Sequence, residues 1–203
     1  MSDTLVALEN EIFPGRKRWT RKECEKLENL GLLPERYELI DGEIISKMGA
    51  KPPHSGTLIF FMRWITLIFG IDFIRNQSPL IIRGEAGKRN EPQPDLAVTV
   101  APFTDYLTRD PAPDDLVLLV EISDSTLRMD KTTKAQLYAQ SGVREYWVAN
   151  VAKRDIIRHR KPKRTGYAEV VTLGPDETIS PEGRPENSIR VGDLFPPLPV
   201  TAE

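Results

Sequence analysis

The chain has 203 residues, of which 39% are apolar and 29% charged, so its composition excludes a disordered chain and fits one domain with a substantial core. Its formal net charge of −2 excludes a general attraction to nucleic acid or acidic membranes, so such binding would need a local patch. The one cysteine, Cys24, excludes an internal disulfide, and residues 1–10 lack the layout of a signal peptide, so we expect a cytoplasmic protein.

The N-terminal part of the chain predicts a helix followed by a hairpin. Thr20 and Glu23 have the spacing of a capping box, which predicts a short helix that ends at Gly31. Two alternating apolar and polar runs flank Asp41-Gly42, which is a strong signal for a tight turn between two strands. We therefore expect a small helix-and-hairpin region at this end.

The remaining elements predict an α/β fold around one sheet. An apolar helix is expected at 54–70, too short for the roughly 20 residues that a bilayer core needs, so no membrane span is expected. A second helix is expected at 130–141, stopped by Gly142. Strands are expected at 71–77, 79–84, 95–100, 116–123, 144–151, 155–161, 167–173 and 188–195. Wholly apolar runs such as LVLLV indicate strands buried on both faces, with helices above and below one mixed sheet.

Two carboxylates stand where burial is expected. Asp95 follows a proline at the start of DLAVTV, and Glu121 ends the apolar run of LVLLVEIS. A lone ionised carboxylate is costly to bury, so each needs a partner or a metal. Adjacent strands would bring the two together at one edge of the sheet, where a divalent cation relieves their repulsion. Hard oxygen ligands suit Mg²⁺, and the backbone carbonyl of Ile122 would add another oxygen.

Lysines follow on the next predicted helix. Lys134 is placed to point back toward the end of the Glu121 strand, and Lys131 lies one turn earlier on nearly the same face. A metal-activated water with a cation beside it is the machinery for splitting a phosphodiester. Structural alternatives stay open: Asp95 as a turn residue, and Glu121 paired with Lys134 in a salt bridge that serves only stability.

Four segments together resemble the Uma-two family of proposed restriction endonucleases, within the PD-(D/E)XK nuclease superfamily. They are YELIDGEI at 37–44, QPDLAV at 93–98, LVLLVEIS at 116–123 and KAQLYAQSGVREYWVAN at 134–150. The resemblance spans about 32–198. It implies a restriction-endonuclease-like mixed sheet flanked by helices, with an N-terminal helix and hairpin, in a single domain over 1–203.

The resemblance also implies a magnesium-dependent nuclease site. By matched position Asp95 and Glu121 are its acids, and Lys134 is its lysine with Lys131 in reserve, since Ser123 stands where the superfamily lysine would be. Glu38 resembles an additional acidic residue of the site, with an exposed strand residue as the alternative. His54 is either a neighbour of the site or a hydrogen-bonding residue at a helix start. The family's Ser-Pro pair after the glutamate is replaced here by residues 124–125, Asp-Ser.

Basic residues concentrate in KRDIIRHRKPKR, 153–164. On a hairpin, Arg154, Arg158 and Arg160 would form one stripe that contacts phosphates without reading sequence. The alternative is a charged edge that prevents sheet-to-sheet pairing.

The function expected from the sequence is a Mg²⁺-dependent endonuclease that hydrolyses DNA, with Mn²⁺ as a possible substitute. The competing reading is a non-catalytic module that binds nucleic acid or protein on a nuclease fold. A homodimer would suit an enzyme that cuts both strands of a duplex.

Overall fold

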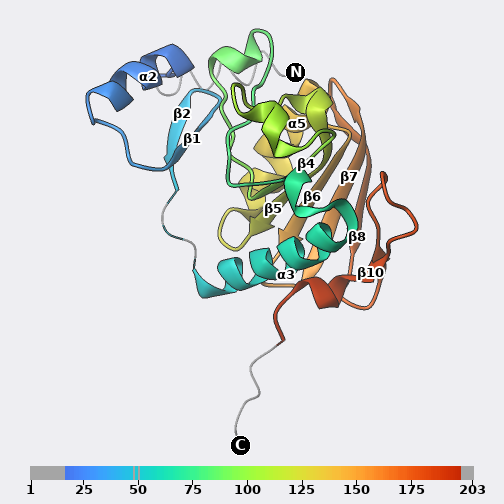
Figure 1. Cartoon of the computed structure of the whole chain (residues 1–203). Helices are drawn as coiled ribbons and strands as arrows, with labels where there is room; N and C mark the ends of the chain where they lie inside the picture. Colours follow the sequence, from blue (N-terminus) through green and yellow to red (C-terminus); the bar gives the residue numbers. More distant parts are fainter. Residues whose placement is uncertain (1–16, 48, 50, 198–203) are drawn as a thin grey trace, which may run out of the picture. The chain divides into compact units, whose positions relative to one another are not determined.

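The computed structural model describes residues 17–47, 49 and 51–197, shown in colour in Figure 1. Of these, residues 17–47 and 84–91 belong to one compact unit, and residues 49, 51–83 and 92–197 belong to a second. A single domain over 1–203 stays a prediction. Residues 1–10, on which the expectation about a signal peptide depends, lie outside the described residues.

The first helix in the described part of the first unit is α2 (Arg21–Asn29). The predicted capping box is present, because the Thr20 hydroxyl accepts a hydrogen bond from the Glu23 backbone and the Glu23 carboxylate accepts one from the Thr20 backbone. After the helix, Gly31 takes a φ of +66°, the left-handed conformation that glycine adopts without strain. The buried face of α2 presents Cys24 to a small apolar cluster.

The predicted hairpin follows as β1 (Tyr37–Ile40) and β2 (Glu43–Ser46), which pair antiparallel. Asp41 and Gly42 occupy the turn with φ angles of +48° and +75°. Two residues with positive φ are the requirement of the tight turn whose twist matches that of the strands, which explains the Asp-Gly pair. A 3-10 turn, η2 (Ala86–Lys88), completes this unit.

The second unit contains a six-stranded sheet in the order β3-β4-β5-β6-β7-β8. Its strands are β3 (Ile74–Asn76), β4 (Leu96–Thr99), β5 (Leu116–Ser123), β6 (Glu145–Asn150), β7 (Asp155–Lys163) and β8 (Gly166–Leu173). Strands β5 and β6 run parallel, whereas the other neighbours pair antiparallel. The sheet is therefore mixed, as the sequence predicts. A two-stranded ladder of β9 (Thr178–Ile179) and β10 (Ile189–Arg190) accompanies it.

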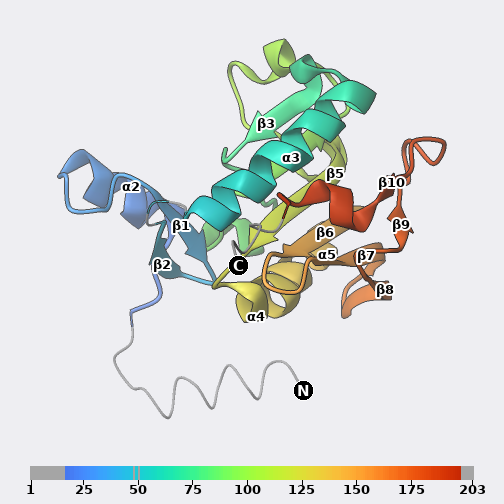
Figure 2. The same ribbon diagram turned by 90° about the horizontal axis from the view of Figure 1, so that it is seen from below.

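Helices cover both faces of this sheet, and Figure 2 shows α3 (Pro52–Phe69) and α5 (Ala135–Ser141) on opposite sides of it. Side chains of α3 pack with Leu96 and Val120 in one apolar cluster, and side chains of α5 pack with Ala97 and Leu119 in another. In β4, and in β5 from Leu118 onward, alternation thus sends even-numbered residues toward α3 and odd-numbered residues toward α5. Among the described helices, none is long and apolar enough to cross a membrane.

The crossover from β5 to β6 carries three consecutive helical pieces instead of one regular helix. They are α4 (Leu127–Met129), a π-helical turn η5 (Asp130–Lys134) and α5. The helix predicted at 130–141 is therefore present, but it starts earlier. Gly142 ends it in the left-handed conformation, with φ +88°, as predicted.

Three predicted strands differ from the structure. The strand at 71–77 is shortened to β3, because residues 71–73 form a 3-10 turn. The strand at 79–84 is wrong, because the Leu80 backbone N–H bonds to Pro92 whereas that of Ile81 bonds to Pro111, so no single neighbour forms a ladder. Its apolar residues are instead core residues in a loop. The last predicted strand, 188–195, is reduced to β10, since Val191–Leu194 forms a 3-10 turn. Other 3-10 turns are η1 (Ile71–Phe73), η3 (Phe103–Tyr106) and η4 (Pro113–Asp115).

Candidate active site

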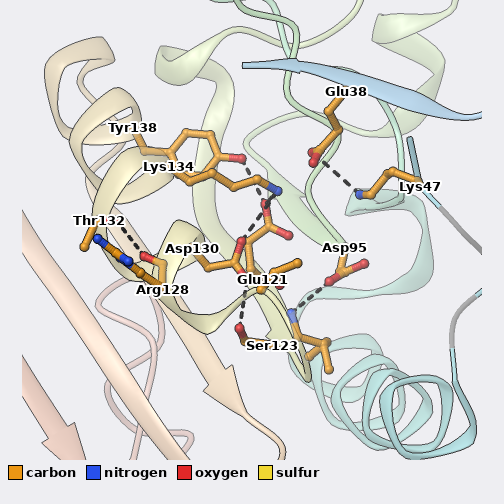
Figure 3. Close-up of polar contacts among 12 residues, drawn as sticks. Glu38, Lys47, Asp95, Glu121, Ser123, Arg128, Asp130, Thr132, Lys134 and Tyr138 are labelled. Carbon is orange, nitrogen blue, oxygen red and sulfur yellow. Dashed lines mark hydrogen bonds and ion pairs between the residues drawn. The ribbon is translucent and has the colours of Figure 1, made fainter. Parts of the chain in front are cut away.

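The ends of β4 and β5 bring two predicted site residues together. The antiparallel strands pair Leu96 with Val120. Asp95, one residue before Leu96, and Glu121, one residue after Val120, therefore stand at neighbouring positions. Glu121 lies on the sheet face that α5 covers, where Tyr138 contacts it, whereas Asp95 precedes β4 and contacts His54 of α3. Figure 3 shows the two side chains leaving adjacent segments at this end of the sheet.

Asp95 is held by contacts from three elements. Its Oδ2 accepts a hydrogen bond from the Ile122 backbone N–H at 2.8 Å, and Gln77 Nε2 donates to Oδ1 at 3.2 Å. His54 Nε2, on the first turn of α3, lies 3.1 Å from Oδ2. His54 Nδ1 is buried without a hydrogen-bond partner among the described residues, so we assign the proton to Nε2, which donates to Asp95. His54 is thus a direct neighbour of the predicted acid.

Glu121 is the centre of a buried polar cluster. Lys134 Nζ lies 2.9 Å from its Oε1, and both side chains are only 3% exposed. The Tyr138 hydroxyl donates to the same oxygen at 3.0 Å. A charge removed from water in this way needs such partners, because an isolated buried carboxylate is strongly unfavourable. The predicted convergence of Glu121 and Lys134 is therefore present in the structure.

Asp130 belongs to the same cluster, although it was not among the predicted site residues. It is 1% exposed, and its Oδ2 accepts hydrogen bonds from the hydroxyls of Ser123 and Thr126. Its Oδ1 lies 3.7 Å from Lys134 Nζ. The spacing of four residues between Asp130 and Lys134 was the signal in the sequence that would have revealed this contact.

The π-helical turn explains how the lysine reaches the strand. Within η5 the Ala135 backbone N–H bonds to the carbonyl of Asp130, five residues earlier. Such turns are rare and occur often at functional sites. Here the turn carries Asp130 at its start and Lys134 at its end, and both side chains are buried.

The charges at this end of β4 and β5 suit a divalent cation. Three carboxylates, those of Asp95, Glu121 and Asp130, accompany one ammonium, that of Lys134, which leaves an excess of negative charge. No group of three or more His, Cys, Asp or Glu side chains arranged to hold a metal ion occurs in the described part of the chain. Mg²⁺ needs fewer, because it keeps several waters and binds through one or two carboxylates. The donor set of Asp95 and Glu121 therefore fits Mg²⁺.

The other predicted site residues lie elsewhere. Lys131 is exposed, whereas Lys134 is the lysine that contacts Glu121. Glu38, on β1 of the first unit, forms an ion pair with Lys47 (Figure 3), with 3.6 Å between Oε1 and Nζ. Its part in the site stays a prediction. The Ile122 N–H contacts Asp95, and a role of its carbonyl as a ligand also stays a prediction.

The predicted arginine stripe does not have the expected geometry. Arg154 precedes β7 in a turn with φ +57°, so the alternation that aligns Arg158 with Arg160 does not extend to it. Its guanidinium donates to backbone carbonyls of Gly192 and Pro196. The other two arginines contact acids: Arg158 pairs with Glu169, and Arg160 with Glu145. Binding of nucleic acid by these residues stays a prediction.

Comparisons with known proteins agree with the fold. A family model named Uma2 and described as "Putative restriction endonuclease" matches residues 24–192. Among solved structures, a protein described as a putative nuclease belonging to DUF820, from Anabaena variabilis ATCC 29413, has a TM-score of 0.61 and 18% identity. The match covers 83% of this chain and 96% of that one, which shows a shared fold. No curated protein matched the sequence.

Proposed function

This chain belongs to the Uma2 family, and we propose that it is a Mg²⁺-dependent endonuclease that hydrolyses phosphodiester bonds in DNA. The observation that carries the proposal is the placement of Asp95 and Glu121 at neighbouring positions, with Lys134 against Glu121. Two acids of this kind can hold a divalent ion that activates water, and a lysine beside them adds positive charge for phosphodiester hydrolysis.

Asp95 and Glu121 would hold the ion in this proposal, and Mn²⁺ would replace Mg²⁺ because it prefers the same oxygen ligands. When bound, the ion supplies Lewis acidity and lowers the pKa of water. Contacts within the protein position both carboxylates. The Ile122 N–H, Gln77 and His54 fix Asp95, and Tyr138 and Lys134 fix Glu121.

Lys134 supplies positive charge beside the reacting phosphate. Its ammonium is fixed before substrate arrives, so little reorganisation is needed as negative charge develops on the phosphate oxygens. Lysine has three N–H donors on a flexible stem, and it acts on phosphate as a point charge. We assign Lys134 the task of orienting the phosphate and the attacking water.

The first experiment measures cleavage of DNA by the purified chain with Mg²⁺ or Mn²⁺. We expect Asp95→Asn and Lys134→Ala to lower kcat by at least about 100-fold, because each removes a charge that acts in the transition state. Lys131→Ala is the matched control, since it removes an exposed lysine from the same helical segment and leaves cleavage unchanged. Equal cleavage by Lys134→Ala and Lys131→Ala would contradict the role of Lys134.

A second experiment separates an enzyme from a binding module on the same fold. Calorimetric titration of the wild-type chain with Mn²⁺ should give saturable binding that Asp95→Asn and Glu121→Gln both weaken by about tenfold or more. Circular dichroism checks that the variants are folded. Absence of metal binding together with intact DNA binding would replace the nuclease proposal by a non-catalytic role.

A further inference from the structure

We propose that Asp130 is a positioning residue that holds the ammonium of Lys134 against Glu121. The effect on catalysis rests on the function proposed above, whereas the mechanical role rests on contacts alone. In this proposal the carboxylate of Asp130 does not contact the phosphate. It acts through Lys134.

One oxygen of the Asp130 carboxylate is fixed by hydrogen bonds, and the other faces Lys134. Hydroxyls of Ser123 and Thr126 both donate to Oδ2. The other oxygen, Oδ1, lies 3.7 Å from the Lys134 ammonium. Because the group is planar, fixing Oδ2 also fixes the direction of Oδ1. The result is a rigid negative charge behind the lysine.

The backbone of Asp130 is fixed as well. The Tyr146 hydroxyl donates to the Asp130 carbonyl at 3.0 Å, and the Ala135 N–H bonds to the same carbonyl across the π-helical turn. Tyr146 lies on the central strand β6 with 0% exposure, so it cannot move without disturbing the core. The turn that presents Lys134 is therefore tied to the sheet at Asp130.

A free lysine side chain would not keep one geometry unaided. Its stem has four methylene groups and considerable rotamer entropy, and one ion pair to Glu121 restrains only its end. A second carboxylate on the helix side places the ammonium between Glu121 and Asp130. Ser123, two residues after Glu121, thus contributes indirectly: the strand supplies a hydroxyl that fixes Asp130, and the helix supplies the lysine.

The test compares Asp130→Asn with a matched control, Asp124→Asn. Asparagine keeps the shape of Asp130 and an oxygen that accepts from the two hydroxyls, but it removes the negative charge behind Lys134. Asp124 lies on the same crossover from β5 to β6, in the bend before α4, and its partner Lys51, 4.0 Å away, is largely exposed. Each change is made in the wild-type chain and in the Lys134→Ala background, with kcat, KM and the Mn²⁺ dissociation constant measured.

We expect Asp130→Asn to lower kcat by about 10- to 100-fold with KM unchanged, because the lysine loses its fixed position. The Mn²⁺ dissociation constant should stay within about twofold, because Asp130 holds no metal in this proposal. In the Lys134→Ala background, Asp130→Asn should cause no further loss, since its effect passes through Lys134. Ser123→Ala should give a smaller decrease in the same direction, and Asp124→Asn no change.

Three results would overturn the inference while leaving the nuclease proposal intact. One is a kcat that falls equally in the two backgrounds, which would indicate a general structural effect. Another is weaker Mn²⁺ binding by Asp130→Asn that equals that of Glu121→Gln, which would make Asp130 a ligand. The third is unchanged activity of Asp130→Asn.

If the wild-type chain cuts no DNA, the proposed function fails, but the positioning role of Asp130 can still be tested without an activity assay. Urea unfolding of Asp130→Asn, Lys134→Met and the double variant gives three unfolding constants relative to wild type. If Asp130 holds Lys134, the increase for the double variant is at least about fivefold smaller than the product of the single increases. Increases that simply multiply would show that the two side chains are independent, and the positioning role would be rejected.

Discussion

Replacement of Glu145 by alanine should destabilise the sheet of the second unit strongly. Glu145 opens β6, is 1% exposed, and meets donors from three directions. Its Oε1 accepts from the Trp147 indole at 2.9 Å and from Arg160 Nε at 2.8 Å. Its Oε2 accepts from the Glu182 backbone N–H at 2.6 Å. One carboxylate therefore connects β6, β7 and the segment before β10.

The size of the effect follows from what alanine leaves behind. Removing one partner of a buried ion pair costs about 3–5 kcal/mol, and an orphaned buried donor costs about 1–3 kcal/mol. The Arg160 side chain keeps 16% exposure, so water partly compensates its charge. We therefore expect a loss of about 4 kcal/mol in the free energy of unfolding. With an m value of about 2 kcal/mol per M urea, the midpoint falls by about 2 M.

Glu145→Gln removes the charge and keeps the shape of the side chain, so it tests how the free energy of unfolding depends on pH. Burial raises the pKa of Glu145 above its ordinary 4.5, more than its hydrogen bonds and Arg160 lower it. The folded state then binds the proton more tightly than the unfolded state, so the contribution of Glu145 is greatest below pH 4.5 and declines as the pH rises. As the pH rises above 4.5, the difference in the free energy of unfolding between wild type and Glu145→Gln should therefore become smaller.

Urea unfolding followed by tryptophan fluorescence, at pH values on both sides of 4.5, measures both effects. A loss below about 1 kcal/mol for Glu145→Ala, with an unchanged m value, would show that water replaces the carboxylate. A deficit of Glu145→Gln that widens with rising pH would contradict the assigned cause of the raised pKa.

Other measurable consequences concern the turn, a buried histidine and the hairpin arginine. Gly42→Ala should lower the free energy of unfolding, measured by urea titration, by roughly 1–2 kcal/mol, because φ is +75° at this position. The control Gly49→Ala should change it little, because its new Cβ meets nothing within 4 Å. Burial lowers the pKa of His159 below 6.5, so stability falls as the pH decreases from that value, and thermal melts should show His159→Phe to be less acid-sensitive than wild type. If Arg158 contacts a phosphate, Arg158→Ala should weaken DNA binding in fluorescence anisotropy and reduce the salt slope by about 1, while unchanged affinity excludes it from the interface.

The sequence predicts the centre of the sheet well for a physical reason. The run at 116–123 matches β5 because an unbroken apolar segment is compatible with burial on both faces, whatever its neighbours are. The Asp-Gly turn is equally local, since its backbone angles dictate its residues. The pairing of Asp95 with Glu121 required only that their strands be adjacent, and the register then brought them together.

Features that depend on distant partners were harder to predict. Asp130 reads as an ordinary helix residue until Ser123 and Tyr146 are placed beside it by the crossover and by β6. The segment 79–84 has the composition of a strand, but its backbone bonds go to two separate loops. Arg160 reads as a surface cation, yet its partner Glu145 becomes visible only from the register of β6 with β7.

The parallel pairing of β5 with β6 has a consequence for the order of assembly. A β-hairpin such as β7 with β8 closes over two residues, 164–165, whereas β5 meets β6 only after the residues at 124–144 have looped back. Contacts between distant residues form slowly because chain entropy is lost first. We therefore expect β5 to pair with β6 late during refolding, after the hairpin of β7 with β8 has formed.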